Sequence, residues 1–229
     1  MEHTSREFER ELKSLRERLL AMGGRAEQQF ARAIDALVRR DAALAASVID
    51  DDVKVDQDEI DIDEAAFLIL AKRQPVASDL RFIMLALKVV TDLERIGDMA
   101  VNIAKRQRDL VMPADSPLLQ DLKELADRVQ RALRLSLDSF VNADAVSAEN
   151  VIRDDTEIDH LNTQFIATLL AGEHLSPAES ARLLTLSSVS RYLERIGDHS
   201  TNIAEMVIYY VRGRDVRHHL GPSVVRPTK

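Results

Sequence analysis

The sequence predicts an all-α protein made of two tandem three-helix bundles, with six helices related by an internal duplication. Three observations lead to this prediction. The 229 residues are 45% apolar and 31% charged but only 4% aromatic, with seven glycines and six prolines, a balance typical of soluble helical proteins. Prolines and capping residues divide the chain into six long segments. The segment LERIGDMAVNIA at 93–104 recurs as LERIGDHSTNIA at 193–204, with nine of twelve positions identical.

Capping residues and a proline define three helices in the first half. Thr4 or Ser5 is the expected cap of the first helix, and Asp41 begins the second. Pro75 prevents the second helix from continuing, and Ser78 is the expected cap of the third. The predicted helices span about residues 5–40, 41–73 and 78–110.

The second half repeats this organisation after a linker, VMPADSP, that contains two prolines. Ser116 followed by Pro117 has the pattern of a cap and a first-turn proline. Ser176, Pro177 and Glu179 form a capping-box pattern that begins the sixth helix. The predicted helices span about residues 117–141, 144–171 and 177–212.

The duplication also sets the predicted domain boundaries. A shift of 103 residues places Phe30 on Leu133 and Asp41 on Asp144. The third and sixth helices match at a shift of 100, because the turn around Pro75 is three residues longer than its counterpart. A three-helix unit of about 100 residues can bury its own core. We therefore predict one bundle in residues 1–112, a second in 113–215 and a flexible tail in 216–229.

Composition and charge exclude several classes of function. The chain contains no cysteine, which excludes disulfides, thiolate metal sites and cysteine nucleophiles. Its net charge of −8, with arginines interleaved among acids, argues against nucleic-acid binding. No apolar run approaches the roughly 20 residues of a membrane span, and the charged N-terminus lacks the apolar core of a signal peptide. We expect a cytoplasmic protein.

Two carboxylates of the third helix lie on a face that the sequence predicts to be buried or in contact. Glu94 and Asp98 fall one turn apart, on the side that continues backwards through the apolar Val90 and Ile83. Acids four residues apart repel each other, at a larger cost where water is scarce unless a cation compensates. Gly97, which costs a helix about 0.8–1 kcal/mol relative to alanine, predicts close approach by another backbone or a ligand.

A second pair of acids in the preceding helix points to a cation site. Asp52 and Asp56 are also four residues apart, and helices joined by short turns are antiparallel neighbours. Clustered oxygen ligands without His or Cys suit Mg²⁺, Mn²⁺ or iron, with Zn²⁺ as a further candidate. The predicted metal ligands are Asp52, Asp56, Glu94 and Asp98 in the first half and Asp155, Asp159, Glu194 and Asp198 in the second.

Other interpretations of these acids stay open from the residues alone. Asp52 and Asp56 fit a solvated acidic surface, and Glu94 with Asp98 fits an ion pair with Arg95 or another arginine. A carboxylate-bridged di-iron oxidase would use ligands three apart, with histidines, inside the bundle. A purely structural tandem bundle would need only helix packing. Duplication of all four acids favours cation binding over these alternatives.

The quoted segments, together with QPVASDLR at 74–81, resemble the hallmark segments of the PhoU family, the phosphate-specific transport accessory proteins. The resemblance extends from the first helix to about Tyr210. It implies a cytoplasmic negative regulator of phosphate uptake and of the phosphate-starvation response, not an enzyme. Its implied partners are the ATPase subunit of an ABC phosphate transporter and a membrane sensor histidine kinase, and we also expect a homodimer. The resemblance further implies multinuclear iron, or other divalent ions, bound by the eight acids.

The two halves differ at positions that bear on these sites. The first half carries SDLR at 78–81, whose Asp79 and Arg81 have no clean counterpart in AESAR at 178–182. His199 follows the acid Asp198, whereas Met99 occupies the matching place in the first half. We do not expect a single imidazole, present in one copy only, to be a ligand. The sequence therefore predicts that the two sites or partner surfaces are not equivalent.

Overall fold

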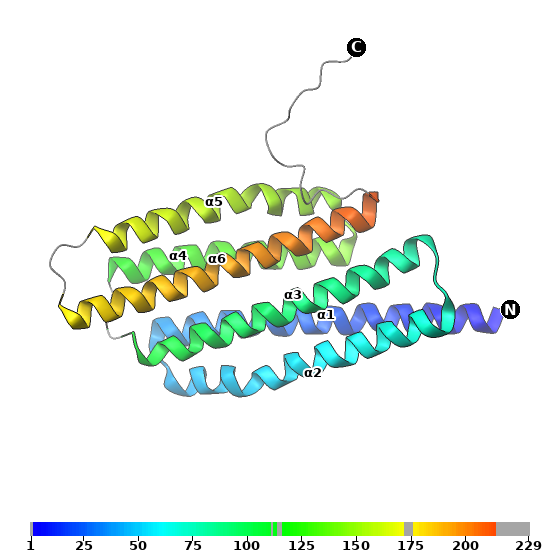
Figure 1. The fold of residues 1–229 in the computed structure, drawn as a ribbon, viewed down its shortest axis with the longest axis horizontal. Coiled ribbons are helices and arrows are strands. Elements are labelled where there is room, and N and C mark those ends of the chain that lie inside the picture. Colours follow the sequence, from blue (N-terminus) through cyan, green and yellow to red (C-terminus); the bar gives the residue numbers. More distant parts are fainter. Residues whose placement is uncertain (1, 111, 114–115, 172–175, 214–229) are drawn as a thin grey trace, which may run out of the picture.

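The computed structural model describes residues 2–110, 112–113, 116–171 and 176–213, and this part of the chain contains helices and turns but no strand. The prediction of six helices in two bundles is confirmed (Figure 1). A single turn of 3₁₀ helix, η1 (Arg106–Arg108), follows the third helix. The helices are α1 (Glu2–Arg39), α2 (Ala42–Arg73), α3 (Ala77–Lys105), α4 (Pro117–Asn142), α5 (Ala145–Leu170) and α6 (Pro177–Arg212).

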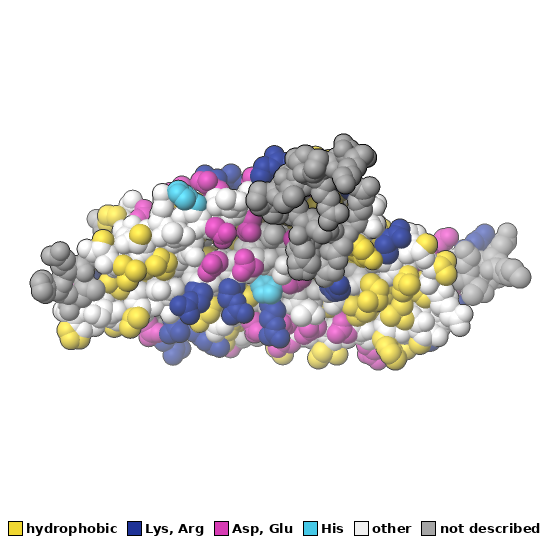
Figure 2. All heavy atoms as spheres, turned by 45° about the horizontal axis from the view of Figure 1, so that its top comes forward, with side chains coloured by type: hydrophobic (Ala, Val, Ile, Leu, Met, Phe, Trp, Pro, Cys, Tyr) yellow, Lys and Arg dark blue, Asp and Glu magenta, His cyan; other side chains and the backbone are white. Residues whose placement is uncertain are grey.

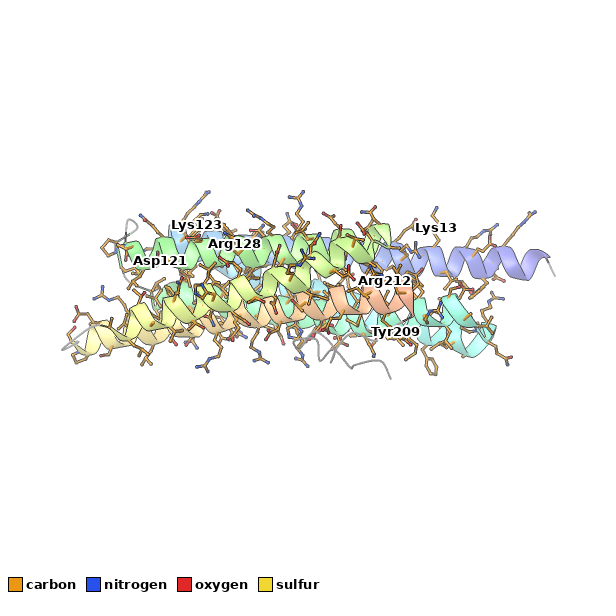
Figure 3. All side chains as sticks on the ribbon, turned by 90° about the horizontal axis from the view of Figure 1, so that it is seen from above. Lys13, Asp121, Lys123, Arg128, Tyr209 and Arg212 are labelled. Carbon is orange, nitrogen blue, oxygen red and sulfur yellow. The ribbon has the colours of Figure 1, made fainter. Side chains whose placement is uncertain are left out.

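The two bundles lie side by side along their length and make an elongated molecule (Figure 1). Within the first bundle each of α1, α2 and α3 packs against the other two, and α4, α5 and α6 do the same in the second. The bundles join mainly through α3 against α6, with α1 also packing against α4. Charged side chains such as Lys13 and Lys123 extend outward from α1 and α4 (Figure 3). Among the described residues, no helix combines the length and apolarity that a membrane crossing requires.

Residues at equivalent positions of the two halves are buried in the same way, as the duplication in the sequence predicts. Phe30 and its counterpart Leu133 are both fully buried. The motif residue Leu93 and its counterpart Leu193 are buried in the same way. Because α3 and α6 also pack against each other, their apolar sides help to join the two bundles into one continuous core.

Several helix boundaries follow the predicted capping chemistry. Asp41 is the N-cap of α2, and its carboxylate accepts a hydrogen bond from the backbone N–H of Leu44 at 2.9 Å. At the equivalent position Asp144 caps α5. The capping box of α6 is confirmed, since the hydroxyl of Ser176 accepts from the backbone of Glu179 while the Glu179 carboxylate accepts from the backbone of Ser176.

Three predicted boundaries are wrong. Helix α1 already begins at Glu2, so neither Thr4 nor Ser5 is its cap. The N-cap of α3 is Val76, without a side-chain bond, because the chain leaves Pro75 in an extended conformation and enters the helix before Ser78. Helix α3 ends at Lys105 rather than at residue 110, where the chain turns and buries Leu110 and Met112 against the core. The predicted tail, residues 216–229, lies outside the described residues.

Candidate metal sites

The structure brings the eight predicted acids together in two groups, one in each bundle. In both groups a pair from the middle helix faces a pair from the third, and each group includes acids whose negative charges act on one another. Acidic side chains gather near the middle of the molecule, beside basic ones (Figure 2). We call Asp52, Asp56, Glu94 and Asp98 the first acid face, and Asp155, Asp159, Glu194 and Asp198 the second acid face.

Glu94 dominates the electrostatics of the first acid face. Burial, followed by the negative charge of Asp98, raises the pKa of Glu94 to about 7, while Arg95 acts in the opposite direction. Burial also raises the pKa of Asp52, reinforced by neighbouring aspartates and opposed by a hydrogen bond from Gln29. Near neutral pH Glu94 is therefore only partly ionised, and a bound cation would favour its ionised form.

The second acid face places its most perturbed carboxyl on the other helix. Burial, followed by the charge of Asp159, raises the pKa of Asp155 to about 6, and the nearby hydroxyl of Thr201 opposes this shift. Burial also raises the pKa values of Glu194 and Asp198, again reinforced by neighbouring acids. The two faces thus share their acids but differ in which helix carries the most perturbed group, α3 in the first and α5 in the second.

The alternative of an ion pair with Arg95 accounts for only part of the first acid face. Arg95 Nε lies 3.3 Å from Glu94 Oε2, and its Nη1 lies 3.1 Å from Asp98 Oδ2. The Arg95 side chain is 54% exposed, and ion pairs in contact with solvent contribute little. Glu94 Oε2 remains buried without a hydrogen-bond partner. Arg95 thus makes an ion pair but no hydrogen bond with Glu94 Oε2, and one exposed guanidinium leaves most of the negative charge of the first acid face uncompensated.

The glycines of the repeated motif allow the two acid-bearing helices to approach each other. A Cβ atom on Gly97 would lie 3.3 Å from Val55 Cγ1 and 3.4 Å from Asp52 Oδ1, both on α2. On Gly197 it would lie 3.4 Å from Ile158 Cγ2, which is ordinary contact. The close approach predicted from the sequence is therefore present, and it is tighter in the first bundle.

The donor chemistry of both faces suits a hard cation, because carboxylate oxygens are the ligands that such ions prefer. The buried Glu94 oxygen that accepts no hydrogen bond and the raised pKa values also fit a site that a cation would stabilise. Within the described residues, however, no three Asp, Glu or His side chains already stand close enough together to hold one ion. Metal binding by the eight acids therefore remains a prediction.

A family model described as the PhoU domain matches residues 19–107 and again residues 122–207, once in each bundle. The chain belongs to the PhoU family. It is 43% identical over 217 residues to a phosphate-specific transport system accessory protein PhoU homolog of Pseudomonas putida, covering 94% of this chain and 85% of that protein. It is 38% identical over 216 residues to the accessory protein PhoU of Escherichia coli K12, covering 94% of this chain and 90% of that protein.

Solved PhoU structures share the fold. The crystal structure of PhoU from Pseudomonas aeruginosa superposes with a TM-score of 0.86 at 41% identity, covering 90% of this chain and all of that one. The phosphate transport system regulatory protein PhoU from Streptococcus pneumoniae superposes with a TM-score of 0.83 at 26% identity, covering 91% of this chain and 99% of that one. The family resemblance and the two-bundle fold predicted from the sequence are thus confirmed.

Two residues beside the first acid face of this PhoU-family chain escaped the sequence analysis. Gln29 of α1 is 3% exposed, and its amide donates a hydrogen bond to Asp52 Oδ1 at 2.9 Å. Glu59 of α2 lies on the same side of the helix as Asp56, three residues earlier, and its charge acts on Glu94. Two features of the sequence could have identified them. Gln29 is a glutamine among the core positions of α1, and Glu59 is spaced so that it shares one side of α2 with Asp52 and Asp56.

His199 contacts the other bundle. Its Nδ1 lies 2.6 Å from Asp92 Oδ1 on α3, and both side chains are largely buried. Asn202 approaches the same carboxylate at 3.5 Å. The imidazole therefore takes part in the α3–α6 contact that joins the two PhoU domains. Its environment accounts for this histidine without a role as a metal ligand.

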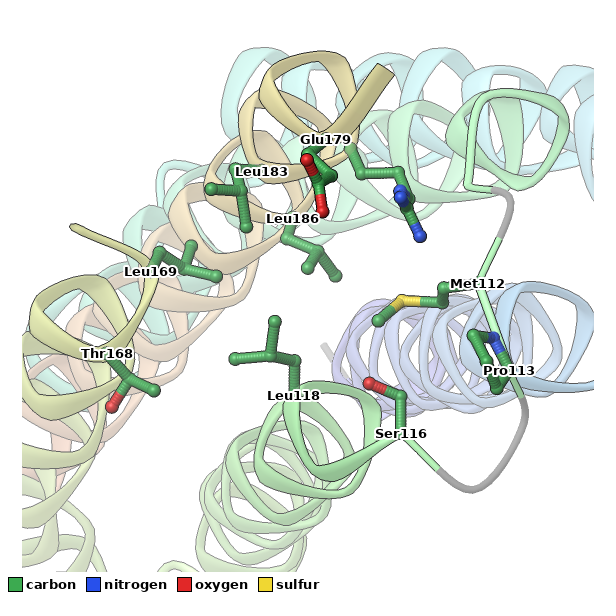
Figure 4. Close-up of a pocket in the computed structure, with 10 residues that line it drawn as sticks. Met112, Pro113, Ser116, Leu118, Thr168, Leu169, Glu179, Leu183 and Leu186 are labelled. Atoms are coloured by element: carbon green, nitrogen blue, oxygen red, sulfur yellow. The ribbon is translucent and has the colours of Figure 1, made fainter. Parts of the chain in front are cut away.

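A pocket of about 290 Å³ lies far along the second bundle, between α4, α5 and the start of α6 (Figure 4). Leucine side chains, among them Leu118, Leu169 and Leu186, line much of it. Its described lining includes one carboxylate, Glu179, which belongs to the capping box of α6. Its other polar lining residues are Ser116, Thr168 and Arg182, so the pocket lacks the grouped carboxylates that distinguish the acid faces.

Proposed function

We propose that this PhoU-family chain is a cytoplasmic accessory protein of a phosphate-specific transport system, acting as a negative regulator of phosphate uptake and of the phosphate-starvation response. In this proposal it is a metal-binding adaptor, present as a homodimer. It contacts the ATPase subunit of the ABC phosphate transporter and a sensor histidine kinase, and it reaches the membrane only through these partners. It carries out no reaction of its own.

One observation carries the proposal: two PhoU domains in one chain present the same four carboxylates on matching helices. Relatives that match over most of their length are phosphate-specific transport system accessory proteins, which supports the regulatory part. Neither packing nor surface solubility requires two acid pairs, each with at least one half-buried member, to recur with a glycine in the third-helix motif. A recurring cation-binding surface does require such a pattern.

The eight acids would hold divalent or trivalent metal ions, with multinuclear iron as the leading candidate and Mn²⁺, Mg²⁺ or Zn²⁺ as alternatives. A bound ion would supply positive charge where like-charged carboxylates otherwise repel. Glu94 would release its proton, and Gln29 would hold Asp52 in place through the amide hydrogen bond. The ion would then tie α2 to α3, and α5 to α6, which fixes the outer surface that each bundle offers to a partner.

The two alternative functions gain no support. A di-iron oxidase would need histidine ligands beside the acids inside the bundle. His199, which follows Asp198, is engaged with Asp92, and His160, which follows Asp159, is exposed. A purely structural bundle would give no reason to keep a carboxyl at Glu94, whose pKa is raised by burial and whose buried oxygen accepts no hydrogen bond. An oxygen-uptake measurement on the iron-loaded protein tests the oxidase directly, and we expect no uptake above that of free iron.

A phosphate-starvation reporter in a cell lacking its own PhoU protein tests the regulatory role. Expression of this chain should restore repression of the reporter in high phosphate, and pull-down should recover the transporter ATPase and the sensor kinase. A chain that is folded and expressed but neither represses nor recovers either partner would contradict the proposal. A variant with all eight acids changed to Asn or Gln separates the adaptor surface from metal binding, since only the latter must be lost.

A further inference from the structure

The side chains around the two acid faces differ although the acids themselves are repeated. By the shift of 103 residues, Glu59 of α2 occupies the place of Asn162 of α5, and Gln29 of α1 occupies the place of Ala132 of α4. A charged group and a buried amide in the first bundle thus correspond to a neutral amide and a methyl group in the second. Glu59 and Gln29 lie beside the first acid face, and Asn162 lies beside Glu194 of the second.

Glu59 adds a fifth carboxylate to the first acid face. Asp52, Asp56 and Glu59 are spaced four and three residues apart, so that they share one side of α2. Glu59 is half-buried, and burial, followed by the charge of Asp63, raises its pKa. Its charge acts on Glu94, and the charges of Asp56 and Asp98 act on Glu59 in return.

Neutral groups stand at the corresponding places of the second acid face. Asn162 accepts a hydrogen bond from the Ser190 hydroxyl, and its amide lowers the pKa of Glu194 against the effect of burial. Thr201, in the place of Val101, presents a buried hydroxyl near Asp155. Asn162 and Thr201 are neutral and add no negative charge for a cation, and the buried hydroxyl oxygen of Thr201 has no hydrogen-bond partner.

Gln29 adds a buried oxygen that belongs only to the first bundle. Its amide nitrogen is occupied by Asp52 and by the carbonyl oxygen of Val48, at 2.9 and 3.3 Å. Its Oε1 is buried and has no hydrogen-bond partner. This oxygen lies 3.1 Å from the position that a Cβ on Gly97 would take, and Asp52 Oδ1 lies 3.4 Å from the same point. An unpartnered buried acceptor is costly, and it faces the gap between the acid-bearing helices.

We propose that the two acid faces are unequal cation sites and that the first, through Glu59 and Gln29, binds a divalent cation more tightly than the second. The inference rests on the metal-binding part of the proposed function. Affinity for hard cations follows the number and charge of the oxygen ligands, and outer-shell partners change metal affinity about 10–100-fold. A difference of at least about 10-fold in dissociation constant between the two faces is therefore expected.

Mn²⁺ titration of the full chain, followed by calorimetry and by the electron paramagnetic resonance signal of free Mn²⁺, tests this inference. Neutralising one acid face leaves the other as the only one to measure. The variant D155N/D159N/E194Q/D198N removes the second face and so reports on the first, and D52N/D56N/E94Q/D98N removes the first face and so reports on the second. The reciprocal exchanges are then Glu59→Asn in the first background and Asn162→Glu in the second. We expect Glu59→Asn to weaken the first face about 10-fold and Asn162→Glu to strengthen the second.

Glu64→Gln is the matched control, because it removes one charge from an exposed position of α2 away from the acid face. It should leave both affinities unchanged, which separates a ligand effect from an effect of net charge. Equal affinities of the two isolated faces, or reciprocal exchanges that change neither, would overturn the inference while leaving metal binding in place. A wild-type chain that binds no Mn²⁺ and no iron would instead overturn the metal-binding proposal as well. Circular dichroism of each variant confirms that it is folded.

Discussion

The two acid faces carry the same acids on matching helices, yet the carboxyl group with the most strongly raised pKa lies on a different helix in each face. In the first face the most perturbed group is Glu94 of α3, with a pKa of about 7. In the second it is Asp155 of α5, with a pKa of about 6. Helix α1 contributes Gln29 to the first face, whereas α4 carries an alanine, Ala132, at the equivalent position of the second bundle. Both bundles therefore carry the same acids, whereas burial, modified by neighbouring charges and hydrogen bonds, decides which acid of each face is most perturbed.

The largest expected effect comes from removing the acids of one face. The double substitution E94Q/D98N should abolish high-affinity metal binding by the first bundle and leave the second bundle's binding unchanged. Metal content by elemental analysis should fall while the helical circular dichroism signal stays the same, because both positions tolerate a neutral isostere. The substitution D61N/E64Q on exposed positions of α2 is the control with the same charge change. Collapse of the fold in E94Q/D98N would show that these acids are mainly structural.

The raised pKa of Glu94 predicts that the metal-free protein loses stability as pH rises. The native state binds the Glu94 proton more tightly than the unfolded state does, so it holds more protons between about pH 4.5 and pH 7. Over that range the free energy of unfolding should fall with rising pH, by roughly 1–3 kcal/mol from this group. Urea unfolding at pH 5 and pH 7.5 in the presence of a chelator measures the change.

Glu94→Gln sharpens this measurement because it removes the titrating group and keeps the shape. The variant should be more stable than the wild type at pH 7.5 and should lose most of the pH dependence contributed by the first face. Asp155→Asn should likewise remove most of the pH dependence of stability contributed by the second face, over a lower pH range that ends near pH 6. Identical pH profiles for the wild type and both variants would show that these carboxyls are ordinary surface acids.

The motif glycines should respond differently to alanine. Gly97→Ala gains helix propensity of about 0.8–1 kcal/mol but forces Cβ against Val55 and Gln29, and overpacking costs about 1–3 kcal/mol. We expect a net loss of about 1 kcal/mol in unfolding free energy. Gly197→Ala meets only ordinary contacts and should stabilise the chain by up to about 1 kcal/mol. Thermal unfolding of both variants, with metal removed, decides between this order and its reverse.

The periodic features of the chain were predictable, whereas the features that depend on a third helix were not. The repeated LERIGD motif, the spacing of Asp52 and Asp56 and the capping box at Ser176 are local patterns, and the structure shows the predicted adjacency and cap. The role of Gln29 depends on α1 lying behind the gap between α2 and α3. The prediction that Ser78 caps α3 was wrong because backbone geometry after Pro75 decides where that helix begins.

The most local expected effect concerns the N-caps of α3 and α6, where the two halves differ at equivalent positions. Ser176 closes a capping box, whereas Val76 offers no side-chain acceptor. Ser176→Ala should lower the unfolding free energy by about 0.5–2 kcal/mol, because an N-cap hydroxyl satisfies an otherwise free backbone N–H. Val76→Ser should raise the unfolding free energy by less than Ser176→Ala lowers it. Val76 is 73% exposed, so its replacement loses little packing. The next residue, Ala77, has a φ of 48°, so the new hydroxyl would face a distorted first turn. Urea unfolding of both variants measures the pair. Equal and opposite changes would show that the geometry after Pro75 does not limit capping in the first bundle.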